Sequence, residues 1–116
     1  MKRFDGVVEQ ASELELAEET ARADRTGMFN CPHTGVALAA LRKLVKRKTI
    51  RSHERVVVIS TANGLKFADQ KIAYHSGKLA GIHPSQQNRP VELSADPKQI
   101  SEAISHYVER MRLLEP

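Results

Sequence analysis

Residues 55–67 read R-V-V-V-I-S-T-A-N-G-L-K-F, and this stretch decides the predicted fold. Residues 56–59 are four consecutive β-branched residues without alternating polar side chains, a pattern typical of a short strand buried on both faces. Such strands lie in the middle of parallel sheets that helices cover. The run ends at residues 60–64, S-T-A-N-G, which are small, hydroxylated or turn-forming. Ligands of open α/β sheets bind beyond the carboxyl ends of the strands, so this cluster is either a ligand-binding edge or a capped strand end.

A second block precedes this stretch. Residues 24–38 read D-R-T-G-M-F-N-C-P-H-T-G-V-A-L, and a third block, residues 71–75, reads K-I-A-Y-H. Together with S-T-A-N-G-L-K, these blocks resemble the C-terminal sequence of the plant-like threonine synthases, which are pyridoxal 5′-phosphate (PLP) enzymes of fold type II. One departure is Asn63, where many relatives carry His. The resemblance covers nearly the whole chain, and three blocks in the family's order make it specific.

The resemblance implies an α/β fold: a partial parallel sheet of two or three strands flanked by helices, equivalent to the C-terminal part of the large domain of a fold-type II PLP enzyme. It also implies an activity, the conversion of O-phosphohomoserine and water to threonine and phosphate in threonine biosynthesis. This is a lyase reaction at a carbon–oxygen bond of a phosphorylated amino acid. In such an enzyme PLP is the electron sink, and the protein orients the cofactor and tunes its ring nitrogen.

The family match assigns Thr61 as the hydroxyl that bonds the pyridine nitrogen of PLP, with Ser60 as the second choice. Asn63 and Gly64 are then expected at the cofactor edge. A carboxylate in this role would hold the nitrogen protonated, whereas a neutral hydroxyl leaves it largely unprotonated. Lys66 is the nearest lysine in the sequence. Because the family's Schiff-base lysine lies elsewhere, we expect Lys66 to be structural or to face phosphate, and we expect no catalytic residue in this chain.

Proteins of this family are several times longer than this chain of 116 residues. The region in which they carry the Schiff-base lysine and the phosphate loop has no counterpart here. We therefore expect the isolated chain to be inactive as a threonine synthase, and to pair with the remainder of a synthase or with itself. Whether Met1 is a natural start or a cut stays open. The alternative function is a non-catalytic binding or assembly module derived from a PLP enzyme.

Cys31, Pro32, His33 and Thr34 lead into a predicted helix, and the family resemblance makes them a pocket-lining segment. The residues alone allow other interpretations. A zinc site needs about four ligands, and Cys31 is the only cysteine. A Cys–His nucleophilic pair needs side chains that meet in space, which residues two apart at a turn seldom do. The plainest interpretation is that Cys31 and His33 pack and hydrogen-bond at the helix entry, and we expect no metal.

Local signals predict two helices in the first half of the chain. Ser12 and Glu15 form a capping box, which predicts a helix over residues 13–24. Residues 36–41 are apolar on every side, which predicts a second helix that is buried through its first turns and runs to about residue 47. Gly35 permits a close approach by a neighbouring group.

Further local patterns predict the remaining elements and the divisions of the chain. A short strand is expected at residues 5–10 and a short helix over residues 67–75. Asp96, followed by proline, is expected to cap a strongly amphipathic helix. The predicted divisions are residues 1–78, an α/β segment of a PLP-enzyme large domain; residues 79–95, an exposed loop with a possible edge strand at residues 91–93; and residues 96–116, the C-terminal amphipathic helix.

The charge and composition narrow the class of partner. The formal net charge of +4 permits binding to polyanions without requiring it. The densest basic stretch runs from Arg42 to Arg55 and contains no interleaved aromatic residue. We therefore interpret it as a solvated helix end and not as a nucleic-acid-binding site. One cysteine and no apolar run of membrane-spanning length favour a cytoplasmic protein without a membrane partner. The basic stretch comprises Arg42, Lys43, Lys46, Arg47, Lys48, Arg51 and Arg55.

Overall fold

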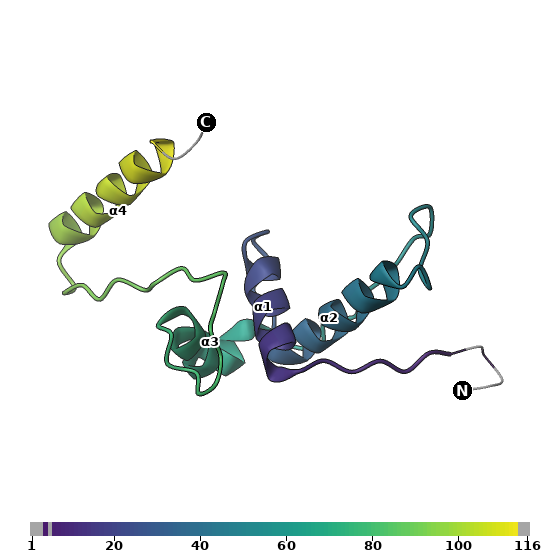
Figure 1. Ribbon diagram of the computed structural model, residues 1–116. Coiled ribbons are helices and arrows are strands. Elements are labelled where there is room, and N and C mark those ends of the chain that lie inside the picture. The colour runs from purple at the N-terminus through teal and green to yellow at the C-terminus, as the bar shows by residue number, and fades with distance from the viewer. Residues whose placement is uncertain (1–3, 5, 114–116) are drawn as a thin grey trace.

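The computed structural model describes residue 4 and residues 6–113, and this part of the chain is helical without a sheet (Figure 1). No helix within it is long and apolar enough to cross a membrane. The helical elements in chain order are α1 (Glu13–Asp24), α2 (Pro32–Lys46), the 3₁₀ helix η2 (Gly64–Phe67), α3 (Ala68–His75) and α4 (Pro97–Arg112).

The predicted α/β fold with a partial parallel sheet is wrong for this chain. Residues 56–59 have no strand partner in the described part of the chain, and Val57 and Ile59 are 88% and 77% exposed. β-Branched residues favour a strand only where other strands take up their backbone N–H and C=O groups and cover their side chains. Residues 91–93 and residues 6–10 form no strand either, and residue 5 of the first predicted strand lies outside the described residues.

Helix α1 begins as the sequence predicts. The Ser12 hydroxyl accepts a hydrogen bond from the amide of Glu15 at 3.3 Å, and the Ser12 amide donates to the Glu15 carboxylate at 2.8 Å. The prediction of a capping box is therefore confirmed. The same carboxylate accepts a hydrogen bond from Lys43 Nζ of α2 at 2.7 Å. One acidic side chain thus caps α1 and ties it to α2.

The crossing of α1 and α2 depends on Gly35, which is buried. A β-carbon at this position would collide with the hydroxyl of Thr20 and the backbone carbonyl of Leu16 on α1. The predicted close approach is therefore confirmed. Helix α2 runs to Lys46, as expected, but Thr34, Gly35 and Ala39 are its buried residues and most of its apolar side chains are only partly covered.

A small core lies between α1 and α3. Its buried members are Leu16, Ala17 and Ala21 of α1 and Tyr74 of α3, and four partly buried residues pack against them. These four are Ala11, Val36, Leu79 and Ile82. Since Leu79 and Ile82 follow α3, the segment that we expected to be an exposed linker folds back onto α1 instead.

Hydrogen bonds to Glu18 hold this returning segment. The Glu18 carboxylate accepts from the Tyr74 hydroxyl at 2.9 Å and from the amide of Ser85 at 2.6 Å. Burial and the neighbouring Glu18 carboxylate raise the pKa of Tyr74 to about 12, so its hydroxyl remains a donor at neutral pH. Further along, the amide of Asn88 donates to His75 Nδ1 at 3.0 Å.

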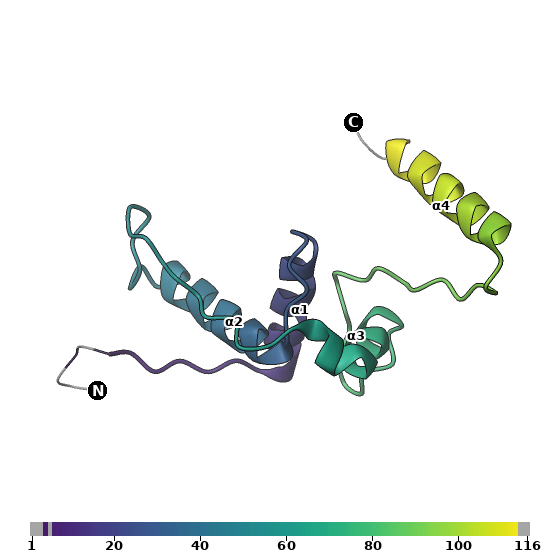
Figure 2. The ribbon, with the colours of Figure 1, turned by 180° about the vertical axis from the view of Figure 1, so that it is seen from behind.

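Asp96 caps helix α4 as predicted, since its carboxylate accepts a hydrogen bond from the amide of Lys98 at 2.9 Å. The last residues of the helix predicted over residues 96–116, 114–116, lie outside the described residues. No residue of α4 is buried, and Figures 1 and 2 both show the helix apart from the others, at the end of an extended connection. Its apolar side chains are consequently exposed: Ile100, Ile104, Tyr107, Val108 and Met111.

Substitution of Gly35 by alanine tests the crossing of the first two helices. Alanine favours a helix interior over glycine by about 1 kcal/mol, but its β-carbon would meet the Leu16 carbonyl, which cannot move aside without distorting α1. We expect Gly35→Ala to lower the free energy of unfolding by about 1–3 kcal/mol, measured by urea denaturation followed by circular dichroism. Adding Thr20→Ala removes the other obstacle. Full recovery in this double variant would show that the carbonyl is not the barrier.

The contacts of Glu15 predict an acid transition. Its hydrogen bond from Lys43, followed by that from the Ser12 amide, lowers its pKa from 4.5 to about 2. Because the folded state binds this proton more weakly than the unfolded chain does, the stabilisation is complete above about pH 4.5 and is lost as the pH falls toward 2. We expect the melting temperature to fall over this range. The fall should be smaller in Glu15→Gln, whereas the control Glu102→Gln on α4 should retain it.

Candidate functional site

The structure brings together two of the sequence blocks that resemble the synthases, residues 24–38 and residues 55–67. Asn30 and Asn63 form an isolated antiparallel bridge, and the amide of Gly64 donates to the carbonyl of Phe29 at 2.9 Å. Cys31 and Thr61, which are 30 positions apart, thereby come into contact. The segment that enters α2 and the segment that enters η2 therefore form one polar cluster.

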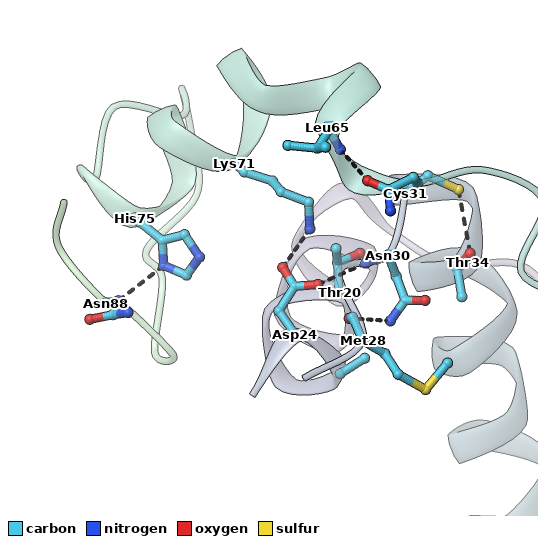
Figure 3. A network of polar contacts seen from close by, with 12 residues as sticks. Thr20, Asp24, Met28, Asn30, Cys31, Thr34, Leu65, Lys71, His75 and Asn88 are labelled. Atoms are coloured by element: carbon cyan, nitrogen blue, oxygen red, sulfur yellow. Dashed lines mark hydrogen bonds and ion pairs between the residues drawn. The ribbon is translucent and has the colours of Figure 1, made fainter. Parts of the chain in front are cut away.

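Three side chains of this cluster are linked by hydrogen bonds. The Thr34 and Ser60 hydroxyls lie 2.9 Å apart, and the Ser60 hydroxyl donates to Asn30 Oδ1 at 3.3 Å. The Asn30 side chain is itself fixed, because its Nδ2 donates to the Met28 carbonyl at 2.8 Å (Figure 3). Asn30 is only 4% exposed. Ser60 and Thr61 reach solvent, so the cluster has a buried base and an exposed edge.

Cys31 lies at the buried end and is fully excluded from solvent. Its Sγ is 3.4 Å from the Thr34 hydroxyl and 4.0 Å from the Thr61 hydroxyl. Burial raises the pKa of the Cys31 thiol, but hydrogen bonds from Thr34, His33 and Thr61 outweigh it and lower the pKa to about 6.

A zinc site gains no support, and Cys31, although His33 is among the groups that lower its pKa, is fully buried and closed to a substrate. No group of three or more potential metal-binding residues occurs in the described part of the chain. His33 is exposed and its ring meets the edge of Phe67, with the ring centroids 5.6 Å apart. The structure therefore favours packing and hydrogen bonding at the entry of α2, where Cys31 is the N-cap residue and Pro32 is the first helical residue.

Asn63 and Gly64 have structural contacts of their own. The Asn63 side chain accepts from the amide of Leu65 at 2.9 Å and so caps η2. Gly64 is buried, and a β-carbon there would lie 2.7 Å from the Asn30 carbonyl and against the side chain of Lys71. Glycine is needed at this point because the two segments approach each other so closely.

An ion pair that sequence analysis missed supports the cluster. Lys71 of α3 donates to the carboxylate of Asp24 at the end of α1, and the other carboxylate oxygen accepts from the Asn30 amide at 3.0 Å (Figure 3). Lys71 Nζ also lies 4.2 Å from the centre of the Phe29 ring. Both ionic partners stand in the blocks that carried the resemblance, but 47 positions separate them, so no local pattern could pair them.

The exposed edge of the cluster is open rather than enclosed. A cavity of about 20 Å³ lies between α1 and α3, beside Asp24 and Lys71, and has room for roughly one water molecule. A wider surface cleft lies between α1 and α2. Neither is lined by Ser60 or Thr61. The described residues therefore present these hydroxyls on a surface, where they can provide one side of a ligand site.

Comparison with known proteins identifies the relationship of this chain. No protein-family model matches it. The chain is 46% identical over 108 residues to threonine synthase 2, chloroplastic, of Arabidopsis thaliana. This match covers 93% of the chain but only 21% of the plant protein, so the chain spans about a fifth of the length of this relative. The resemblance found in the sequence is therefore confirmed: the chain is related to a segment of the threonine synthases.

Proposed function

We propose that this chain is a segment of a PLP-dependent threonine synthase and forms one side of the cofactor site. The observation that carries the proposal is 46% identity over nearly the whole chain. The exposed hydroxyl edge supports it, because the side chains that the family match assigns to the cofactor lie together there. The reaction of the whole enzyme would convert O-phosphohomoserine and water to threonine and phosphate.

The exposed edge has the chemistry for one contact to the cofactor ring. When bound, PLP would supply the electron sink of the reaction. Thr61 is exposed and its hydroxyl lies 4.0 Å from the sulfur of Cys31, so it remains able to donate to a pyridine nitrogen. A neutral donor leaves that nitrogen unprotonated. Asn63 and Gly64 form the backbone turn beside it, and the segment from Cys31 to Thr34 forms its buried base.

The described lysines next to this edge do not suit a Schiff base. A lysine nucleophile must be neutral and free to attack an aldehyde. Lys71 is held by the Asp24 carboxylate and the Phe29 ring, and Lys66 is exposed on η2. We therefore propose that the catalytic lysine comes from the part of the synthase to which this chain has no counterpart. A cytoplasmic location belongs to the proposal, although the plant relative is named chloroplastic.

Labelling and complementation test the proposed function. The isolated chain, incubated with PLP and reduced with borohydride, should show no stoichiometric label on a single lysine and should form no threonine. Co-expression with a polypeptide that matches the remaining length of the plant relative should restore threonine formation. Selective labelling of one lysine together with activity in the isolated chain would contradict the proposal that the catalytic lysine comes from the rest of the synthase. No activity in the mixture would contradict the proposed segment function.

The exposed apolar surface favours a second candidate, a non-catalytic assembly module. Residues 56–59 have no strand partner in the described part of the chain. The side chains of Val56, Val57 and Ile59 and the apolar face of α4 are in contact with water, which a soluble monomer seldom allows. Nucleic-acid binding is less favoured. Three of the basic side chains of the stretch from Arg42 to Arg55 are paired with carboxylates: Arg42 with Glu19, Lys43 with Glu15 and Arg47 with Glu9.

We expect the isolated chain to self-associate, because its exposed apolar groups gain free energy by leaving water. Light scattering over a concentration series should show a rising molar mass. Ile104 is 59% exposed near the middle of the apolar face of α4, so Ile104→Lys should reduce association, whereas Ser105→Lys on the same helix should not. A strictly monomeric, cooperatively melting chain that binds no apolar dye would contradict this expectation.

A further inference from the structure

We infer that Asn30 is a positioning residue of the cofactor edge: it holds the Ser60 proton within the chain and leaves Thr61 as the hydroxyl that donates to a ligand nitrogen. This inference rests on the proposed function, since it concerns the same edge. It goes further by naming a residue that does not itself reach the ligand and by deciding between two adjacent hydroxyls.

The side-chain amide of Asn30 has one fixed orientation. Its Nδ2 donates to the Met28 carbonyl at 2.8 Å, which fixes the two ends of the side chain. Oδ1 therefore faces Ser60, at 3.3 Å. A carbonyl oxygen can only accept, so the Ser60 hydroxyl must be the donor. Because a hydroxyl carries one proton, the proton of Ser60 is committed to Asn30.

The donors of the other hydrogen bonds in the cluster follow from the commitment of the Ser60 proton. Ser60 has no proton left for the 2.9 Å contact with Thr34, so the Thr34 hydroxyl donates to Ser60. Thr34 can then only accept in its 3.4 Å contact with Cys31, so the thiol donates there. Thr61 stands at the end of this series, 4.0 Å from Cys31 Sγ, the longest contact in the cluster. Its proton is the least tightly held and remains available to a ligand.

The commitment of Ser60 to Asn30 holds while Cys31 carries its proton. If Cys31 is a thiolate, Thr34 turns its proton to the sulfur, and the 2.9 Å contact between Thr34 and Ser60 then needs Ser60 as its donor. The orientation of Asn30 is secured from its backbone in either state, because its amide donates to the Asp24 carboxylate at 3.0 Å. With a protonated thiol, Asn30 is therefore the group that decides which hydroxyl faces outward with a free proton.

A first measurement needs no ligand. The three-bond couplings of the Ser60 β protons report whether its side chain occupies one rotamer. We expect a single rotamer in the wild-type chain and averaged couplings in Asn30→Ala, with the single rotamer retained in the matched control Asn88→Ala. Circular dichroism verifies that each variant keeps its helices. Should Asn30→Ala fail to fold, Thr34→Val, which leaves Asn30 intact, should preserve the Ser60 rotamer. Averaged couplings in wild type, or unchanged couplings in Asn30→Ala, would overturn the inference.

A second measurement uses 4′-deoxypyridoxine 5′-phosphate, which has the pyridine ring and phosphate of PLP but no aldehyde to react with lysines. The probe is titrated into the full chain, and the ¹⁵N shift of its ring nitrogen reports hydrogen bonding. We expect Thr61→Val to weaken binding about tenfold and to remove the shift. In an Asn30→Ala background the Ser60 hydroxyl is free to donate to the ring nitrogen in place of Thr61. Thr61→Val should then weaken binding by less than about threefold, which measures the coupling of the two sites.

The two measurements separate the two claims. Absence of probe binding to the wild-type chain would contradict the proposed cofactor contact, while the Ser60 couplings would still decide whether Asn30 positions Ser60. Equal losses from Thr61→Val in both backgrounds would show that Asn30 does not determine the donor. A ring-nitrogen shift that persists in Thr61→Val alone would show that Thr61 is not the donor.

Discussion

The Asp24 carboxylate is the interaction on which the arrangement of this chain depends. It receives Lys71 of α3 on one oxygen and the Asn30 amide on the other, and so joins the end of α1, the entry of α2 and helix α3. Both charged side chains are nearly buried. A buried ion pair is weak evidence of net stability. Removal of one partner, however, leaves the other charge buried and unpaired, at a cost of about 3–5 kcal/mol. The junction therefore tolerates little change at either residue.

The polar cluster is built directly on this junction. The Asn30 amide is fixed by Asp24 and its side chain by Met28, and Gly64 permits the close approach of the second segment. Ser60 and Thr61, both exposed residues, follow at the edge. The chain thus orders the buried half of a hydroxyl edge without enclosing a ligand. This suits a segment that provides one side of a site, in keeping with a match to about a fifth of a longer relative.

The contrast between the helices and residues 56–59 has a single physical cause. A helix closes its backbone hydrogen bonds within four residues, so α1, α2 and α4 form wherever caps and propensity allow. A strand needs hydrogen-bond partners from another segment, and the described residues offer none to Val57 or Ile59. The same β-branched run therefore forms no strand and is largely exposed. The apolar face of α4 is likewise formed but uncovered.

The sequence by itself determined the features whose contacts lie within a few residues: the capping box of Ser12 and Glu15 and the Asp96 cap of α4. The family resemblance named Ser60, Thr61, Cys31 and Thr34 and the relationship to threonine synthases, but not their mutual contacts. Only the tertiary structure decided that residues 56–59 find no strand partner among the described residues, that Lys71 pairs with Asp24, and that Asn30 takes the proton of Ser60. Each of these depends on groups 30 or more positions apart or on partners outside the segment, and no local periodicity encodes such distances.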